Sequence, residues 1–123
     1  MALNKNSGYC ELTVGETTYP IKFGMGAWAI IAEERNSPMD KVFEGLSELQ
    51  FVAWIVYGGI NHACLAGYSD SKPLSSIHVA YDLIEELTGE QMGLVGKTFA
   101  ATKVNGQTMK DIIDKLPAEK KKK

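Results

Sequence analysis

The segment from Ser47 to Ala66 constrains the fold of this chain more than any other feature of the sequence. Ser47 and Gln50 form the Ser-x-x-Gln pattern of a helix capping box, and Gly67 is a natural point for the helix to end. Because apolar residues cover almost the whole circumference of this predicted helix, we expect it to be the central, most buried element. The stripe that we expect to be nearly inaccessible comprises Val52, Val56, Ile60, Ala63 and Cys64.

The same helix does not fit a membrane span. Its unbroken apolar run extends only from Phe51 to Ile60, and the polar residues Asn61 and His62 follow directly. Since a span needs about 20 predominantly apolar residues, we expect no membrane association.

An N-terminal β-hairpin is predicted from two short extended runs around a turn. The alternating run Tyr9–Val14 is interrupted at Gly15–Glu16, and a β-branched and aromatic run, Thr17–Phe23, follows. Pro20 places the second strand at a sheet edge, because proline has no N–H to donate to a neighbouring strand. An isolated hairpin is only marginally stable in water, so we expect it to pack on an apolar element or on another chain.

Helical spacing of apolar residues predicts several further helices. They are one after Gly24 with Met25, Trp28, Ile31, Ala32 and Arg35 at helical spacing, a short helix at Pro38–Glu44 capped by Ser37, one from Ser75 or Ser76 to Thr88–Gly89, one containing Met92, Val95 and Phe99, and one containing Met109, Ile112, Ile113 and Leu116 before Pro117. Gly67–Pro73 is predicted as a loop and Asn105–Gly106 as a turn. The fold class that follows is α+β but mostly α, with the N-terminal β-hairpin packed on a bundle of about five helices.

The length and composition of the chain allow one domain. A chain of 123 residues with 45% apolar residues can fold without a disulfide or a metal. We expect a flexible N-terminus at residues 1–8, a single helical domain with its hairpin at residues 9–117, and a flexible lysine-rich tail at residues 118–123. No signal peptide is predicted, and Cys10 and Cys64 are expected to be free thiols in a reducing cytoplasm.

The charge distribution argues against a nucleic-acid partner. The chain has 13 basic and 15 acidic residues, and four of the basic ones form the terminal run Lys120–Lys123. Without that run the body has nine basic and fifteen acidic residues, with Arg35 as the single arginine. Because binding a phosphate backbone needs a basic surface, we expect nucleic-acid binding not to be the main function.

Candidate catalytic and metal-binding residues do not form a site in the sequence. His62 and Cys64 are two residues apart on a predicted helix and therefore point in different directions. His78 and Asp82 are four apart, but they lie on an ordinary acidic helix face, where a surface ion pair is the simpler interpretation. Burial in the apolar central helix should raise the pKa of the Cys64 thiol and lower its reactivity. We therefore expect no catalytic residue, no metal site and no cofactor.

The stretch Gly24–Ala27 has the position of a phosphate-binding loop but not its residues. It lies between a predicted strand and a predicted helix, yet it lacks the third glycine or the Lys-Ser/Thr pair that would hold a phosphate. A tight strand-to-helix turn explains the glycines, and no enzyme is predicted.

The aromatic residues exceed what one seam of the central helix needs. Large aromatic side chains often anchor protein–protein contacts, and methionines adapt to the shape of a partner. The alternative is that each of these side chains is simply part of the core. The candidate partner-binding residues are Trp28, Phe51, Trp54, Ile55 and Tyr57.

Two segments give the chain a resemblance to a known family. The first is Thr-Tyr-Pro-Ile-Lys-Phe-Gly-Met at Thr18–Met25, and the second is Trp-Ile-Val-Tyr-Gly-Gly-Ile at Trp54–Ile60. Their order resembles that in the tail assembly chaperones of long-tailed bacteriophages and prophages, over residues 9–90 of this chain. The matching positions are Phe23, Gly24 and Met25 at the turn, and Trp54, Tyr57 and Gly58 on the long helix.

The resemblance implies a noncatalytic function in the host cytoplasm. Such chaperones bind the tape-measure protein, a long apolar helical polypeptide, keep it soluble while the tail forms, and tend to form homo-oligomers. Many are made in two lengths by a ribosomal frameshift. The terminal run Lys120–Lys123 is compatible with adenine-rich codons that would suit slippage.

Two other functions remain open from the sequence. One is a structural subunit of the virion, such as a head–tail connector or a tail-completion protein. The other is a small enzyme or ligand-binding domain, which a polar pocket joining His62 or His78 to an acid would favour. An edge strand and exposed apolar surface both favour association with another copy or with a helical partner.

Overall fold

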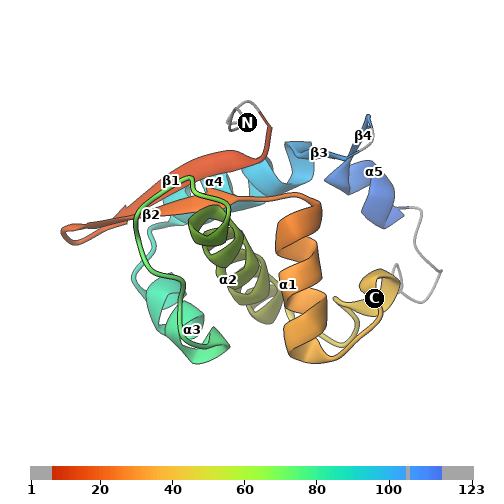
Figure 1. Ribbon diagram of the computed structural model, residues 1–123, viewed down its shortest axis with the longest axis horizontal. Helices are drawn as coiled ribbons and strands as arrows, with labels where there is room; N and C mark the ends of the chain where they lie inside the picture. Colours follow the sequence, from red (N-terminus) through yellow and green to blue (C-terminus); the bar gives the residue numbers. More distant parts are fainter. Residues whose placement is uncertain (1–6, 105, 115–123) are drawn as a thin grey trace.

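The computed structural model describes residues 7–104 and 106–114, which form a mostly helical α+β fold with an N-terminal antiparallel hairpin (Figure 1). The fold class is therefore the predicted one. In chain order the described elements are β1 (Tyr9–Val14), β2 (Thr17–Lys22), α1 (Met25–Arg35), the 3₁₀-helix η1 (Met39–Lys41), α2 (Glu48–Leu65), α3 (Ile77–Glu85), α4 (Gly89–Ala101), β3 (Lys103–Val104), β4 (Gln107–Thr108) and α5 (Met109–Asp114).

The N-terminal hairpin has the predicted two-residue turn. Val14 pairs with Thr17, so that Gly15 and Glu16 form the two-residue turn, and Gly15 has the positive φ of 64° that such a turn requires. Only β1 and β2 form this sheet among the described residues, so Pro20 lies in an edge strand as predicted. The hairpin lies on α2, to which β2 contributes buried side chains.

Helix α2 is the centre of the fold. Both arms of its capping box are present, because the Gln50 N–H donates to Ser47 Oγ at 3.2 Å and the Ser47 N–H donates to Gln50 Oε1 at 2.9 Å. The helix contacts β2, α1, α3 and α4, and Figure 1 shows it below the hairpin, between α1 and α3. These neighbours cover it on several sides, as its apolar circumference predicts.

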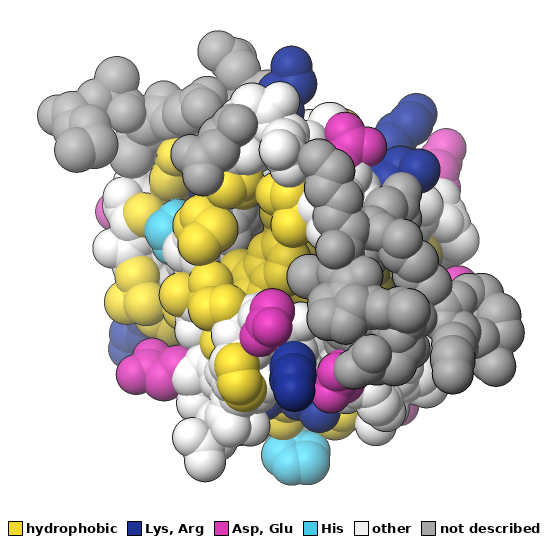
Figure 2. Space-filling model, turned by 90° about the vertical axis from the view of Figure 1, so that its right-hand side faces the viewer, with side chains coloured by type: hydrophobic (Ala, Val, Ile, Leu, Met, Phe, Trp, Pro, Cys, Tyr) yellow, Lys and Arg dark blue, Asp and Glu magenta, His cyan; other side chains and the backbone are white. Residues whose placement is uncertain are grey.

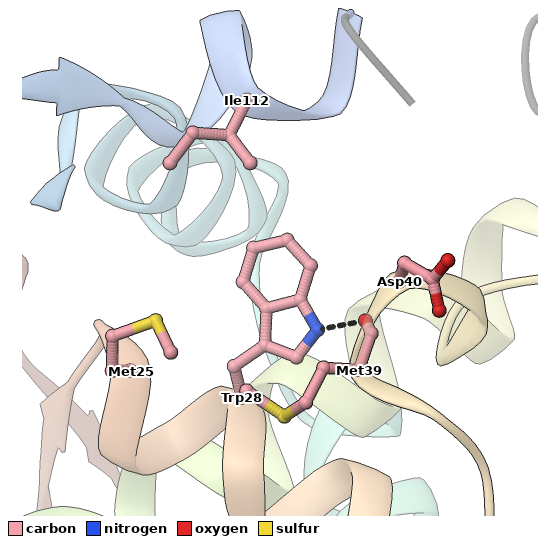
Figure 3. A pocket seen from close by; sticks show the side chains of 5 residues that line it. All are labelled: Met25, Trp28, Met39, Asp40 and Ile112. Carbon is pink, nitrogen blue, oxygen red and sulfur yellow. Dashed lines mark hydrogen bonds between the residues drawn. The ribbon is translucent and has the colours of Figure 1, made fainter. Parts of the chain in front are cut away.

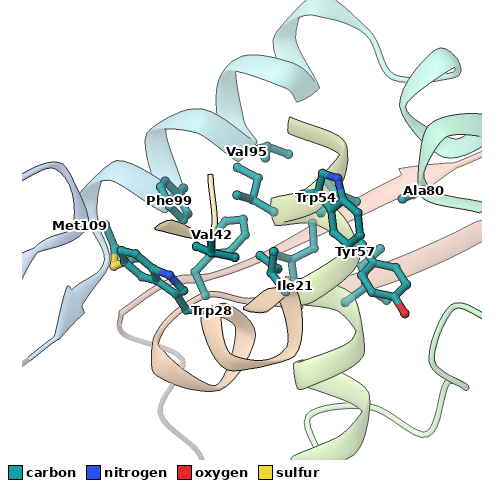
Figure 4. Packing of buried hydrophobic residues seen from close by; sticks show 14 of the residues in the cluster. Ile21, Trp28, Val42, Trp54, Tyr57, Ala80, Val95, Phe99 and Met109 are labelled. Atoms are coloured by element: carbon teal, nitrogen blue, oxygen red, sulfur yellow. The ribbon is translucent and has the colours of Figure 1, made fainter. Parts of the chain in front are cut away.

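The predicted stripe of inaccessible side chains is confirmed in the middle of α2 and wrong at its ends. Val56, Ile60 and Ala63 are buried completely or almost so, whereas Val52 and Cys64 are only half-buried. Val52 and Cys64 lie towards the two ends of the helix, where neighbouring elements cover it less completely. Figure 4 shows the buried side chains that converge on this helix.

Two consecutive glycines allow neighbouring elements to approach the α2 backbone closely. A Cβ atom on Gly58 would lie 2.8 Å from the Ala27 carbonyl oxygen and 2.7 Å from Ile31 Cγ1, both in α1. A Cβ atom on Gly59 would lie 2.6 Å from Ile21 Cγ2. Distances below 3 Å leave no room for a side chain, so these glycines allow α1 and β2 to pack directly on the helix.

The short helix predicted at Pro38–Glu44 is only the 3₁₀-helix η1. Ser37 does not cap it, since Pro38 occupies the N-cap position and no side chain bonds there. The Trp28 indole donates to the Met39 carbonyl, and the Arg35 guanidinium donates to the carbonyls of Val42 and Glu44. Side chains of α1 thus donate hydrogen bonds to backbone carbonyls that, in an α-helix, would accept from the helix's own N–H groups.

The boundary between α3 and α4 differs from the prediction. Thr88 does not end α3; it is the N-cap of α4, where its side chain accepts a hydrogen bond from the Gln91 N–H at 3.1 Å and completes a second capping box. Helix α4 consequently begins at Gly89, before Met92. The start of α3 is capped by Ser76, one of the two predicted positions, without a side-chain hydrogen bond.

A second, very short hairpin was not predicted. Strands β3 and β4 pair antiparallel around the predicted turn, in which Gly106 has φ 82°. Helix α5 follows as expected, whereas Asn105, Leu116 and Pro117 lie outside the described residues.

The two predicted flexible ends fall mostly outside the described residues. Of the N-terminal segment, Ser7 and Gly8 are described, and the Phe23 N–H donates to the Gly8 carbonyl at 2.7 Å. Gly8 is buried, so this part of the segment packs against the domain. Within the described part of the chain, every helix falls short of the length and apolar character needed to cross a membrane.

Candidate functional site

The five predicted partner-binding residues lie in or against the core rather than on the surface. Trp28, Trp54, Ile55 and Tyr57 have exposed fractions of 6%, 9%, 0% and 6%, and Phe51 is half-buried. The aromatic surface that was expected to remain exposed around α2 is instead buried in contacts between rings. These side chains therefore belong to the core of the described chain rather than to an exposed aromatic surface. Trp28 also lines the pocket described below, and binding of a partner by the five residues stays a prediction.

The aromatic rings of α2 pack against each other and against rings from neighbouring segments. The Phe51 ring lies 4.9 Å from that of Phe43 and 5.4 Å from that of Phe99, in edge-to-face arrangements. The rings of Trp54 and Tyr57 are 5.7 Å apart and nearly perpendicular. Phe43 lies in the segment just before α2 and Phe99 lies in α4, so periodicity within α2 could not reveal their contribution.

An open apolar pocket lies beside α1 (Figure 3). It has a volume of about 210 Å³. Its walls come from α1, from η1, which follows α1 closely in the chain, and from α5, which is distant from both in the sequence. Figure 2 shows hydrophobic side chains gathered on the face of the molecule that α1 and α5 share. We call it the methionine pocket and define it by Met25, Trp28, Met39, Asp40 and Ile112.

The inner surface of the methionine pocket is almost free of hydrogen-bonding groups. The Trp28 indole N–H, the one donor on its aromatic wall, already donates to the Met39 carbonyl oxygen at 2.8 Å. Figure 3 shows Met25 and Met39 near this indole, with Ile112 on the far side of the opening. Methionine side chains are flexible and polarisable, so the pocket can adapt to apolar groups of different shapes.

Met25 is an accessible part of the pocket. Its side chain is 53% exposed, although it is large and apolar. It follows Gly24, whose φ of 141° turns the chain from β2 into α1 and whose carbonyl accepts from the Trp28 N–H at 3.0 Å. The turn between β2 and α1 therefore places Met25 at the rim and Trp28 one helical turn further along.

Arg35 stabilises the segment next to the wall of the methionine pocket that η1 forms. Its guanidinium donates to the carbonyl oxygens of Val42 and Glu44 and lies 5.9 Å from the Trp54 ring, in the range of a cation–π contact. These bonds connect α1 to the segment directly after η1. Met39 and Asp40 belong to η1 itself. Sequence analysis placed Arg35 on a helix stripe without a role, and its being the single arginine was the one available signal.

His62 lies against α1, and in the described part of the chain the charge that acts on it is that of Lys22. It packs against Gly26, where a Cβ atom would lie 2.1 Å from His62 Cε1. Burial, and secondarily the charge of Lys22, lower the pKa of His62 below its ordinary value of 6.5. The polar pocket that would favour an enzyme joins a histidine to an acid, whereas the charge acting on His62 is positive.

The two cysteines are half-buried, and burial raises the pKa of both thiols. For Cys64 the raised pKa is the predicted one, although its burial is less complete than expected. Among residues 7–104 and 106–114, no group of three or more histidine, cysteine, aspartate or glutamate side chains is placed to hold a metal ion.

No family model, curated protein or solved structure matches the chain. The features of the chain that bear on its function are the methionine pocket and the two segments that carry the sequence resemblance.

Proposed function

We propose that this chain is a noncatalytic tail assembly chaperone of a long-tailed bacteriophage or prophage. In this proposal it binds the apolar, helical tape-measure protein in the host cytoplasm, keeps it soluble during tail assembly, and acts as a homo-oligomer. The observation that carries the proposal is the methionine pocket, an open apolar site whose two flexible methionines, Met25 and Met39, belong to its lining.

The chemistry of the pocket supports an apolar protein partner. A helical client can insert one side chain of its apolar stripe into such a pocket, as in other helix-in-groove complexes. Burial of apolar surface contributes about 25 cal/mol per Å², so several such contacts along a long client would add to a useful affinity. Because methionine adapts to different shapes, binding would depend little on the exact client sequence.

The two segments that resemble the chaperone family form one packed unit beside this pocket. Gly59 in the second segment meets Phe23 in the first, since a Cβ atom on Gly59 would lie 2.9 Å from Phe23 Cε1. The first segment ends with Met25, which lines the pocket. The resemblance and the pocket therefore involve the same turn, which supports assigning them to one function.

Co-expression with the tape-measure protein of the same genome tests the proposal. The unmodified chain should increase the soluble fraction of that protein, and the double variant Met25→Ser/Met39→Ser should lose most of this effect while retaining its helical circular dichroism spectrum. Leu65→Ser is the matched control, because Leu65 is 70% exposed and lies outside the pocket. Failure of the unmodified chain to solubilise the tape-measure protein would refute the proposed function.

Mass spectrometry of purified mature virions separates the proposal from a structural function. An assembly chaperone should be absent from the particles, whereas a head–tail connector or a tail-completion subunit would be retained in a fixed ratio to other tail proteins. Retention of the chain in the virion would refute the assignment as a chaperone and support the assignment as a structural subunit.

A further inference from the structure

We infer that the methionine pocket selects a partner helix with a basic residue next to the apolar residue that it inserts, and that this basic residue pairs with Asp40. The inference rests on the proposed function, in which the pocket binds a client helix. It adds a charge requirement that an apolar pocket alone would not impose.

Asp40 is the charged residue of the pocket. Among the described residues that line the opening, it is the one with an ionisable side chain, and it is exposed. It lies on η1 next to Met39, whose carbonyl accepts from the Trp28 indole (Figure 3). Lys41 follows in the chain but is not part of the lining. An occupant of the pocket would therefore meet carbon and sulfur inside and a carboxylate at the edge.

Because of helix geometry, one partner segment can contact both the apolar interior of the pocket and the Asp40 carboxylate at its edge. Side chains three or four residues apart lie on the same helix face, about 5–6 Å from each other. A helix that inserts a leucine, isoleucine or methionine can therefore direct a lysine or arginine from the adjacent turn to Asp40. Both cations have long, flexible stems, so the pairing tolerates small differences in the docking angle.

The charge balance of the described part of the chain favours the same partner. Residues 7–114 contain fourteen acidic and seven basic residues. Arg35, one of the seven, donates to the carbonyls of Val42 and Glu44 inside the fold. An acidic body attracts a basic segment before contact and repels an acidic one.

Three synthetic, helix-stabilised peptides test the inference with the full chain. The first has a leucine followed four positions later by a lysine, the second has glutamate in place of that lysine, and the third has serine in place of the leucine. Binding is followed by the ¹³C-methyl NMR signals of Met25 and Met39. We expect the first peptide to shift both signals saturably, the second to bind roughly two- to fivefold more weakly, as an exposed ion pair allows, and the third not to bind.

Charge reversal at Asp40 makes the test specific. Asp40→Lys should invert the preference, so that the glutamate peptide binds better than the lysine peptide. Asp82→Lys is the matched control, because Asp82 is an exposed acid on α3 and changes the net charge by the same amount. Equal effects of the two variants, or binding that leaves the Met25 and Met39 signals unchanged, would overturn the inference.

Other occupants of the pocket give different results. A second copy would shift the Met25 and Met39 signals on dilution without any peptide. The chain's own C-terminal residues would be indicated if Leu116→Ser, which lies outside the described residues, increased peptide affinity. Either result would overturn the assignment to a separate basic helix.

The outcome is also distinguishable from failure of the proposed function. If Asp40→Lys solubilises the tape-measure protein as well as the unmodified chain does, the charge inference fails and the chaperone proposal stands. If the peptides bind as expected but no tape-measure protein is solubilised, the chaperone proposal fails and the charge preference of the pocket stands.

Discussion

The indole N–H of Trp28 donates a hydrogen bond to the carbonyl oxygen of Met39 at 2.8 Å, across the segment that joins α1 to η1. This bond removes a donor from the wall of the methionine pocket and fixes the position of η1 relative to α1. The same contact therefore stabilises the fold and keeps the pocket apolar.

Replacing Trp28 by Phe tests both roles. The variant loses the hydrogen bond and leaves the Met39 carbonyl without this donor, so we expect the free energy of unfolding to fall by about 1–3 kcal/mol. Urea denaturation measures the loss. A change confined to peptide binding, with no change in stability, would contradict the structural role of the bond.

Shortening Val56 tests whether α2 is the centre of the core. Val56 is fully buried, and Val56→Ala removes buried methyl groups and leaves a cavity, which should cost about 1–3 kcal/mol. Val79→Ala is the control, because Val79 is 37% exposed on α3. An unfolding midpoint that Val56→Ala leaves in place would show that the stripe is not core.

Adding a methyl group at Gly58 should also destabilise the fold. Alanine normally favours a helix over glycine by about 1 kcal/mol, but here its Cβ would lie 2.8 Å from the backbone oxygen of Ala27. Because backbone cannot move aside cheaply, we expect Gly58→Ala to lower the free energy of unfolding by about 1–3 kcal/mol.

Gly93 provides the matched comparison on another helix. It lies in α4, where, apart from the neighbouring backbone of the helix itself, no atom of the described residues comes within 4 Å of the position of an added Cβ. Gly93→Ala should therefore stabilise the protein by roughly 0.5–1 kcal/mol in the same denaturation experiment. Stabilisation by both substitutions would mean that α1 and α2 do not pack as closely as described.

Local signals in the sequence predict the elements but not the pocket. The capping box at Ser47 and Gln50 and the turn at Gly15–Glu16 involve neighbouring residues, so they can be recognised without knowing the fold. A second capping box at Thr88 and Gln91 is equally local, but the Thr88–Gly89 pair also has the pattern of a helix end. The two interpretations differ only in which helix the threonine belongs to.

The remaining differences come from contacts between distant residues. The side chains of Trp28 and Arg35 donate hydrogen bonds to the carbonyls of Met39 and Val42, and no periodicity in Pro38–Glu44 reveals these contacts. Likewise, Met25 and Ile112 are far apart in the sequence and line the same pocket only because the fold brings α5 to this side of α1. Sequence periodicity identifies apolar residues, but it does not say which of them a distant element covers.

Arg35 should be needed for the pocket wall rather than for the fold alone. Arg35→Lys keeps the charge but cannot donate to two carbonyl oxygens with a planar fork, so we expect faster hydrogen exchange of the amides in residues 39–44. Peptide binding at Met25 and Met39 should weaken in parallel. Unchanged exchange in this segment would show that the bonds to Val42 and Glu44 do not fix it.

The pH dependence of stability should contain a contribution from His62. Burial and the Lys22 charge lower the pKa of His62 in the folded protein below its ordinary value of 6.5. As the pH falls through 6.5, the unfolded chain takes up a proton that the folded protein resists, so the free energy of unfolding decreases. The loss is complete once the pH is below the lowered pKa of the folded state.

Urea denaturation between about pH 7.5 and pH 5 measures this contribution, since histidine is the side chain that ordinarily titrates in that range. His62→Gln removes the titrating group and should flatten the decrease in stability, because glutamine has no proton to take up. The same replacement at His78, which is exposed on α3, is the control. If His78→Gln flattens the profile as much as His62→Gln does, the packing of His62 against Gly26 beside Lys22 is not the cause of the pH dependence.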